Sequence, residues 1–247
     1  QGLKLTRQAL FYRLESGSEL LKKLLEWSVA YAAKHSVPTQ AIGVLKQFKN
    51  VYICDATLLA LPGKLASVYK GIPKANYLAA IKIQLIFNLT EKRFKRIEVC
   101  AATRNDSKYT NEIAKTLSPL DHLIVELGYL NLVAFREIAE RGAFFLSRIK
   151  SNTRFYVDST MRTGCHTPVV ITDILRKSGG MVDRDIYVGV KTWTRIKVRL
   201  VAIKLPEEVA NERRRKAHKN AKSSGRTLTA YETELLGWSV FMSNIPE

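Results

Sequence analysis

Two acidic residues, Asp55 and Glu126, interrupt apolar segments of the chain and are its first candidates for chemistry. Asp55 lies inside the run 51–61, which is rich in aliphatic and β-branched residues and is closed by Pro62 and Gly63. Such a run predicts a buried strand. A buried carboxylate is costly unless its charge is compensated. Backbone N–H groups at a strand bend or a metal cation could do this, and the run alone leaves both open.

Glu126 ends a second apolar segment, predicted as a strand over 122–127, and a glycine turn follows it. Carboxylates on two strands can converge on one divalent cation, and oxygen ligands suit Mg²⁺ or Mn²⁺. The cysteines at 54, 100 and 165, and the neighbouring pair Cys165 and His166, are not spaced as zinc ligands. The residues therefore indicate a magnesium or manganese site with Asp55 and Glu126 as its ligands.

The order of elements around these two carboxylates predicts an α/β fold. A meander of three strands is followed by helix, strand, helix and strand, which is the order of a ribonuclease H-like fold. In that fold the first and fourth strands are neighbours, so Asp55 and Glu126 are expected to face the same point. The predicted strands are 51–60, 79–90, 94–103, 122–127 and 143–149, and the predicted helices are 106–117, capped by Asn105 or Asp106, and 130–142.

The rest of the chain divides into parts around a core at 48–150. Residues 1–47 are predicted to be helical, with a helix entry at Ser16 to Ser18 and Ser18 as its cap. Residues 151–235 break this order and are predicted to be β-rich. Their short β-like segments are 155–157, 169–171, 185–190 and 197–203, with a turn at 178–180. The whole is an α/β protein with a mixed sheet flanked by helices.

Net charge points to a polyanionic partner. The chain of 247 residues carries 40 Lys and Arg against 22 Asp and Glu, a formal charge of +18. Nucleic acid is favoured over a membrane surface, because no basic amphipathic helix with an aromatic face is visible and no apolar run approaches the ~18 residues of a span. RNA-binding proteins are the competing class. No signal peptide is seen at the start, and three scattered cysteines fit a reducing cytoplasm.

The positive charge is concentrated between residues 191 and 226, which hold twelve Lys or Arg and three Glu. Such a run is either a solvated helix face or an arm that contacts phosphates. In a chain this basic we favour the second interpretation. The candidate DNA-binding residues are Arg195, Lys197, Arg199, Arg213, Arg214, Arg215, Lys216, Lys219 and Lys222.

Two residues beside Glu126 have ordinary interpretations. Tyr129, near a helix start, is expected to pack against the core rather than to stack on a base. His122 is expected to lie at the edge of a strand.

Five segments, in this order along the chain, carry a resemblance to a known family. Together they resemble the DDE transposases of bacterial insertion sequences, specifically the insertion sequence four family, from about residue 40 onward. The most specific pieces are the aspartate strand, the Leu-Gly-Tyr turn after Glu126 and the closing Ser-Asn-Ile-Pro strand. The segments are 51–57, 82–88, 123–129, 145–150 and 236–246.

The resemblance implies cut-and-paste DNA transposition by two Mg²⁺ or Mn²⁺ ions, with Asp55 and Glu126 as catalytic metal ligands. It also implies double-stranded DNA as transposon end and target, a homodimer on DNA, and a nucleoid-associated cytoplasmic protein without membrane contact. The resemblance further implies that 151–235 form a β-rich insertion domain and that 236–247 return to the core as a strand. The N-terminal helical region would help to hold transposon-end DNA or would pack on the core.

The chain departs from the family pattern in two respects. The family has Asp where this chain has Glu126, and its third acidic residue lies in a Tyr-x₂-Arg-x₃-Glu-x₆-Lys helix after the closing strand, which we expect to be missing here. The chain as it stands is therefore expected to be inactive or incomplete as an enzyme. The alternatives to a transposase are an inactive DNA-binding remnant and a metal-dependent nuclease of the same fold.

Overall fold

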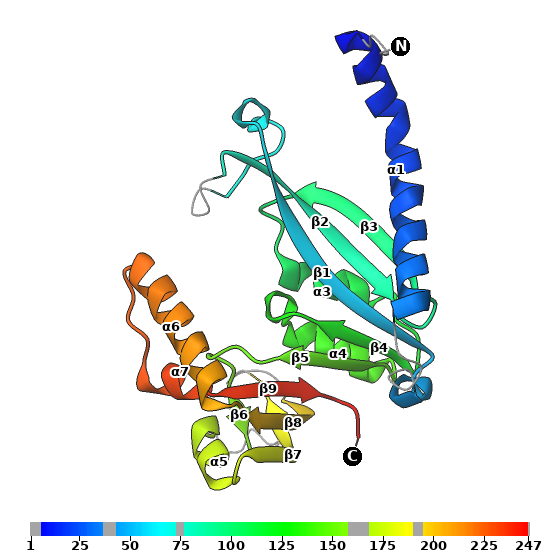
Figure 1. Ribbon diagram of the computed structural model, residues 1–247. Helices are drawn as coiled ribbons and strands as arrows, with labels where there is room; N and C mark the ends of the chain where they lie inside the picture. Colours follow the sequence, from blue (N-terminus) through cyan, green and yellow to red (C-terminus); the bar gives the residue numbers. More distant parts are fainter. Residues whose placement is uncertain (1–5, 37–42, 73–76, 158–167, 190–194, 247) are drawn as a thin grey trace.

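Nine strands form one mixed sheet, with helices packed against it (Figure 1). The computed structural model describes residues 6–36, 43–72, 77–157, 168–189 and 195–246. The strand order is β3-β2-β1-β4-β5-β9-β8-β7-β6. The strands are β1 (Asn50–Leu61), β2 (Ala79–Asn88), β3 (Arg93–Ala101), β4 (Asp121–Val125), β5 (Phe144–Arg148), β6 (Phe155–Tyr156), β7 (Met181–Val188), β8 (Ile196–Lys204) and β9 (Trp238–Ser243).

The α-helices lie between these strands in the predicted places and in others. They are α1 (Arg7–Ser36), α3 (Asp106–Ala114), α4 (Leu132–Glu140), α5 (Ile171–Lys177), α6 (Glu207–Ser223) and α7 (Ala230–Leu235). Short 3₁₀ turns occur at η1 (Val44–Gln47), η2 (Gly63–Leu65) and η4 (Leu127–Tyr129). Within the described residues, no helix combines the length and apolar character that a membrane span requires.

The first five strands confirm the predicted core. β1 is antiparallel to β2 and parallel to β4, β2 is antiparallel to β3, and β4 is parallel to β5. Asn105 caps α3 as predicted, by accepting a hydrogen bond from the N–H of Ser107, and Asn131 caps α4 through the N–H groups of Val133 and Ala134. The first and fourth strands are therefore neighbours, as the element order requires.

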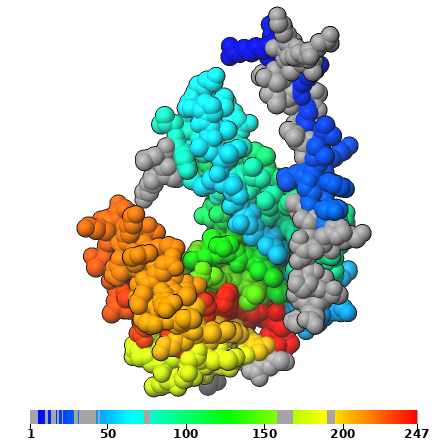
Figure 2. Space-filling view, viewed as in Figure 1, coloured from blue at the N-terminus to red at the C-terminus, as the bar shows by residue number. Residues whose placement is uncertain are grey.

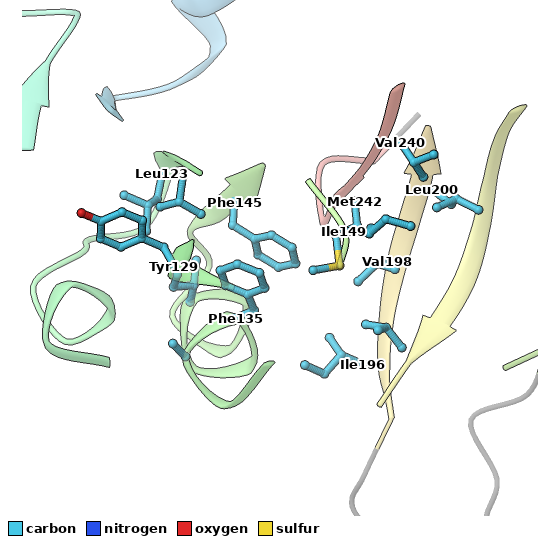
Figure 3. Close-up of a cluster of buried hydrophobic side chains, with 14 of the residues drawn as sticks. Leu123, Tyr129, Phe135, Phe145, Ile149, Ile196, Val198, Leu200, Val240 and Met242 are labelled. Carbon is cyan, nitrogen blue, oxygen red and sulfur yellow. The ribbon is translucent and has the colours of Figure 1, made fainter. Parts of the chain in front are cut away.

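One face of this sheet is closed by α3 and α4. Tyr52 and Cys54 of β1 and Val125 of β4 enter the same buried cluster as residues of these two helices. Figure 3 shows part of it, where the rings of Phe135 and Phe145 stack at 4.3 Å between centroids. Because side chains alternate along a strand, the residues between these buried ones point to the opposite, open face.

The sheet continues beyond the predicted core boundary at residue 150. β9 pairs with β5 on one side and with β8 on the other, both antiparallel, so β7 and β8 extend the core sheet. β8 confirms the segment predicted at 197–203, and β7 contains the described part of the one predicted at 185–190 up to Val188 but begins earlier, at Met181. The prediction for 169–171 is wrong in part, because Val169 forms an isolated bridge with Phe155 and Ile171 begins α5. The division of the chain into domains stays a prediction.

The N-terminal region is helical, as predicted, but its start is not where the sequence placed it. Residues 16–18 lie inside α1, which runs unbroken over 30 residues, so the proposed cap at Ser18 is wrong. A Ser-Gly-Ser triplet resembles a cap locally, but one or two poor helix formers are tolerated within a long helix. Residues 1–5 and 37–42 of this region lie outside the described residues.

His122 is not at a strand edge but in a central strand, β4, and only 3% of it is exposed. Its ring lies 4.4 Å from that of Phe48, and among the described residues neither ring nitrogen has a hydrogen-bond partner. Burial lowers the pKa of His122 from 6.5 to about 4.

This buried histidine predicts a loss of stability in mild acid. Below pH 6.5 the unfolded chain binds a proton that folded His122 does not take up until about pH 4, so the unfolding free energy falls across that window. The gap corresponds to about 3 kcal/mol. We expect His122→Phe to reduce the pH dependence of the unfolding free energy, measured with urea between pH 6.5 and 4.5. His218→Gln, on the exposed part of α6, should not reduce it. Equal pH dependence in both variants would contradict this.

Candidate metal and DNA-binding site

Asp55 is the first residue of β1 beyond its pairing with β4. The pairing of β1 with β4 ends at Cys54, whereas its pairing with β2 continues to Leu61. Asp55 is exposed, and its Oδ1 accepts the N–H of Ala56 at 2.7 Å. The prediction of a buried strand holds for residues 51, 52 and 54 but is wrong for Asp55. The cost of burial is thus no argument for a metal here.

Glu126 stands beside Asp55 in the sheet register. The last pair of the parallel ladder is Cys54 with Val125, so Asp55 and Glu126 are the next residues on adjacent strands. Neighbouring strands lie about 4.8 Å apart. Cys54 and Val125 are buried on the closed face, and both carboxylate residues are exposed on the open one. The geometry therefore places two acidic residues side by side at the carboxyl end of β4.

The carboxylate oxygens of Asp55 and Glu126 are the kind of ligand that a hard divalent cation prefers. Two carboxylates supply only part of its coordination shell. Two adjacent carboxylates on an exposed face match Mg²⁺ or Mn²⁺, which commonly keep water and phosphate oxygens as further ligands. Among the described residues no group of three His, Cys, Asp or Glu could hold a metal ion. Cys165 and His166 lie outside the described residues.

The closed face directly beneath the carboxylates is buried, and it holds two groups whose pKa is shifted. Burial raises the pKa of the Cys54 thiol to about 12, and the charge of neighbouring Asp55 acts in the same direction. Burial also raises the pKa of the Tyr129 phenol. Both groups are therefore neutral at physiological pH. Tyr129 packs in the core as predicted, with 2% of its surface exposed.

The basic run of the sequence forms α6, a helix of 17 residues with Glu207 and Glu208 in its first turn and Lys222 in its last. This charge order suits the helix dipole. Two of its arginines are structural. Arg213 donates to the carbonyl of Trp238 at 3.3 Å, and Arg214 donates to the carboxylate of Glu207 at 2.7 Å.

The other candidate cations of α6 are exposed. Lys216 pairs with Glu212 at 2.5 Å. Arg215, Lys219 and Lys222 are exposed and are spaced by four and three residues, so they share one face of the helix. Figure 2 shows α6, in orange, beside a hollow on the open side of the molecule, with the cyan segment around η2 opposite. This face is the part of the basic run that suits phosphate contacts.

The candidate just before β8, Arg195, and the two within it, Lys197 and Arg199, fit a DNA interface less well. Arg195 is 5% exposed, and its guanidinium lies 3.7 Å from the ring centroid of Tyr156, so this burial leaves little of it for a DNA contact. Lys197 pairs with Asp185, and Arg199 holds Asp183 through two hydrogen bonds of 2.6 Å. Cross-strand pairs on the sheet thus account for the charge of exposed Lys197 and of half-buried Arg199.

Arg148, which the sequence did not single out, lies next to Glu126 in the register of β4 and β5. Arg148 follows Ser147, the β5 partner of Val125, and lines a cavity of about 250 Å³ together with Arg213 and Arg226. Leu127 forms part of the same wall. The cavity therefore brings positive charge from β5 and α6 to the residue that follows Glu126. Arg148 lies in the family-like segment 145–150, and the pairing of Val125 with Ser147 is what makes it a neighbour of Glu126.

The anchored arginines predict a division of roles along α6. Arg214 also donates hydrogen bonds to Oδ1 of Asn211 at 2.9 Å and to the Thr233 carbonyl at 3.4 Å. We expect Arg214→Ala to lower the unfolding free energy by about 1 kcal/mol, because α6 loses its link to α7. Lys219→Ala should leave it unchanged within about 0.5 kcal/mol. Urea titration of both variants checks this, and equal stability would show that Arg214 is not an anchor.

The amino-acid sequence of this chain is similar to those of curated bacterial transposases. The chain is 30% identical over 218 residues to the transposase for insertion sequence element IS231B of Bacillus thuringiensis subsp. berliner, covering 82% of this chain and 45% of that protein. It is 25% identical over 223 residues to the transposase for IS1151 of Clostridium perfringens, covering 85% and 47%. The chain thus spans about half the length of the curated relatives it matches.

Among solved structures, the chain is similar to the piggyBac transposase synaptic complex with hairpin DNA, at a TM-score of 0.40 and 11% identity, over 80% of this chain and 33% of that one. A likeness of this size carries no argument about the site. The family comparison is decisive, because the description "Transposase DDE domain" matches residues 46–239, which include both carboxylates and α6. The chain belongs to the Transposase DDE domain family.

Proposed function

We propose that this chain is the part of an insertion-sequence transposase that supplies two metal-ligating carboxylates, Asp55 and Glu126, and a phosphate-binding helix face. The observation that carries the proposal is their register, which sets them side by side beyond the last pair of β1 and β4. The partner would be the double-stranded DNA of the transposon ends and target. Membership of the insertion sequence four family, a homodimer on DNA and a cytoplasmic, nucleoid-associated location belong to the same proposal.

The residues of this chain would bind the metal ion and position the DNA backbone. Asp55 and Glu126 would hold the divalent ion, Mg²⁺ or Mn²⁺, which when bound supplies Lewis-acid stabilisation of phosphate charge and acidifies a bound water. Arg215, Lys219 and Lys222 would contact backbone phosphates, and Arg148 would lie between them and Glu126. The exposure of all these side chains supports such a path.

The metal part of the proposal is tested by local backbone cleavage. Fe²⁺ takes the place of Mg²⁺ in such sites, and with ascorbate and peroxide it generates radicals that cut nearby peptide bonds. We expect cuts close to residues 55 and 126, and none there in Asp55→Ala. Asp173→Ala, which removes an exposed, ion-paired carboxylate of α5, is the control and should keep both cuts. Cuts elsewhere, or cuts that persist without Asp55, would overturn the shared site.

A further inference from the structure

A chain of buried polar side chains runs beneath the two carboxylates, on the closed face of the sheet. The Tyr129 hydroxyl donates to Oε1 of Gln84, and the Gln84 amide donates to Asp106 at 2.9 Å. Lys82 donates to the same carboxylate oxygen at 2.8 Å and to the Arg104 carbonyl at 2.6 Å. Gln84 is 0% exposed and Tyr129 is 2% exposed. The proposed metal chemistry uses none of these groups.

This network is joined to the backbone on both sides of the site. The N–H of Tyr129 donates to the carbonyl of Glu126 at 3.1 Å and closes the η4 turn. The Thr110 hydroxyl of α3 donates to the carbonyl of Tyr129 at 2.7 Å. Gln84 lies opposite Ala56, the residue after Asp55, in the β1–β2 ladder. One residue, Tyr129, is thus fixed through its hydroxyl, its N–H and its carbonyl.

The η4 turn lies close to Asp106 of α3, with space between them for no more than about a methyl group. A Cβ atom built on Gly128 would lie 3.4 Å from Oδ2 of Asp106, which is ordinary contact distance. Figure 3 shows the Tyr129 ring in the apolar cluster with its hydroxyl pointing out of it. The ring therefore fixes the depth of the turn, and the hydroxyl fixes its rotation through Gln84.

The energetic cost of breaking these buried hydrogen bonds favours one position of the η4 turn. A buried donor or acceptor that loses its partner bears the full cost of its desolvation, so a satisfied network strongly favours one arrangement over shifted ones. If the turn moved, the buried Gln84 and Thr110 side chains would both lose a partner. By contrast Glu126 itself is exposed and has no such restraint from burial.

We propose that Tyr129, held by Gln84 and Thr110, is the positioning residue that sets where the Glu126 carboxylate stands relative to Asp55. Tyr129 touches neither the ion nor the DNA and acts only through the η4 turn. The inference rests on the proposed function, because the position of Glu126 matters chemically only if the two carboxylates share an ion. Its first test therefore needs no metal.

Amide hydrogen exchange of the metal-free 247-residue chain gives that first test. Tyr129→Phe keeps the ring and removes the hydroxyl, and we expect the amides of Tyr129 and Leu130 to exchange at least about 10-fold faster, a 1.4 kcal/mol loss of local protection. Tyr156→Phe is the matched control, because its hydroxyl is also buried but has no partner among the described residues. It should leave these amides unchanged. Unchanged protection in Tyr129→Phe would overturn the inference.

Mn²⁺ titration followed by electron paramagnetic resonance gives the second test. Losing an outer partner of a metal ligand commonly weakens metal affinity by 10–100-fold, and we expect about 10-fold for Tyr129→Phe and for Gln84→Met. The double variant should bind about as weakly as either single one, since both break one link. An unmodified chain that binds no Mn²⁺ through Asp55 would refute the proposed function. Normal Mn²⁺ affinity in Tyr129→Phe would refute only the positioning role.

Discussion

The 247-residue chain should leave duplex DNA uncut in Mg²⁺, and joining to it the Tyr-x₂-Arg-x₃-Glu-x₆-Lys helix expected of the family should produce cleavage. Two-metal catalysis needs enough fixed oxygen ligands to hold both ions against water. The described residues bring together only two carboxylates, Asp55 and Glu126, and no third ligand group. We therefore expect the number of metal ligands, and not the DNA contact, to limit cleavage.

Glu126 adds a second, smaller limit. Its side chain is longer than that of Asp by one C–C bond, about 1.5 Å, and a misplacement of about 1 Å can cost ~100-fold in rate. We expect Glu126→Asp alone to stay inactive, the added helix alone to cut slowly, and both together to cut about 100-fold faster than the helix alone.

The measurement is Mg²⁺-dependent nicking of a duplex that carries the element's ends, with Asp55→Ala in each background as the blank. Robust nicking by the unmodified chain that disappears in Asp55→Ala would show that a further ligand exists in this chain. Equal rates with Glu126 and Asp at that position would show that the longer side chain is not a handicap.

Removing the exposed face of α6 should weaken DNA binding and flatten its salt dependence. Each phosphate contact contributes about 0.9 to the slope of log affinity against log salt, so Arg215, Lys219 and Lys222 together should contribute about 2.7. We therefore expect the triple alanine variant to lose about this much of the slope, with the largest loss of affinity at low salt. Fluorescence anisotropy with a labelled duplex between 50 and 200 mM salt measures it.

A matched variant separates contact from net charge. Arg176, Lys197 and Arg199 are also three cations, but each is paired with a carboxylate on the protein. Replacing them with alanine lowers the net charge by the same amount and should leave most of the slope. If both triple variants flattened the slope equally, the effect would be one of overall charge, and the face of α6 would be merely solvated.

Much of the core and of the carboxylate pair could be predicted from sequence, because these depend on local patterns and element order. Apolar periodicity marks the strands, and the order β-β-β-α-β-α-β makes β1 and β4 neighbours, which aligns Asp55 with Glu126. The exposure of Asp55 was missed for a non-local reason. An apolar run does not reveal that β4 stops pairing at Cys54 while β2 continues.

The basic residues show even more clearly that local sequence patterns do not reveal non-local contacts. All of them look alike in sequence, yet Arg214 lies against Thr233 and Gly237, and Arg195 stacks on Tyr156, 39 positions earlier. Their partners come from segments that only the folded chain brings near. Which cations remain available for phosphate thus depends on tertiary contacts that charge counting cannot supply.

The insertion of β9 between β5 and β8 has a consequence for how the protein is made. The edge of β5 that pairs with β9 ends at Arg148, and β9 begins at Trp238, about 90 residues later. At a synthesis rate of about 5–20 residues per second, that edge waits roughly 5–20 s for its partner. An unpaired strand edge is a template for association with other chains. A nascent chain is therefore most prone to aggregate in the interval after β5 has emerged from the ribosome and before β9 has.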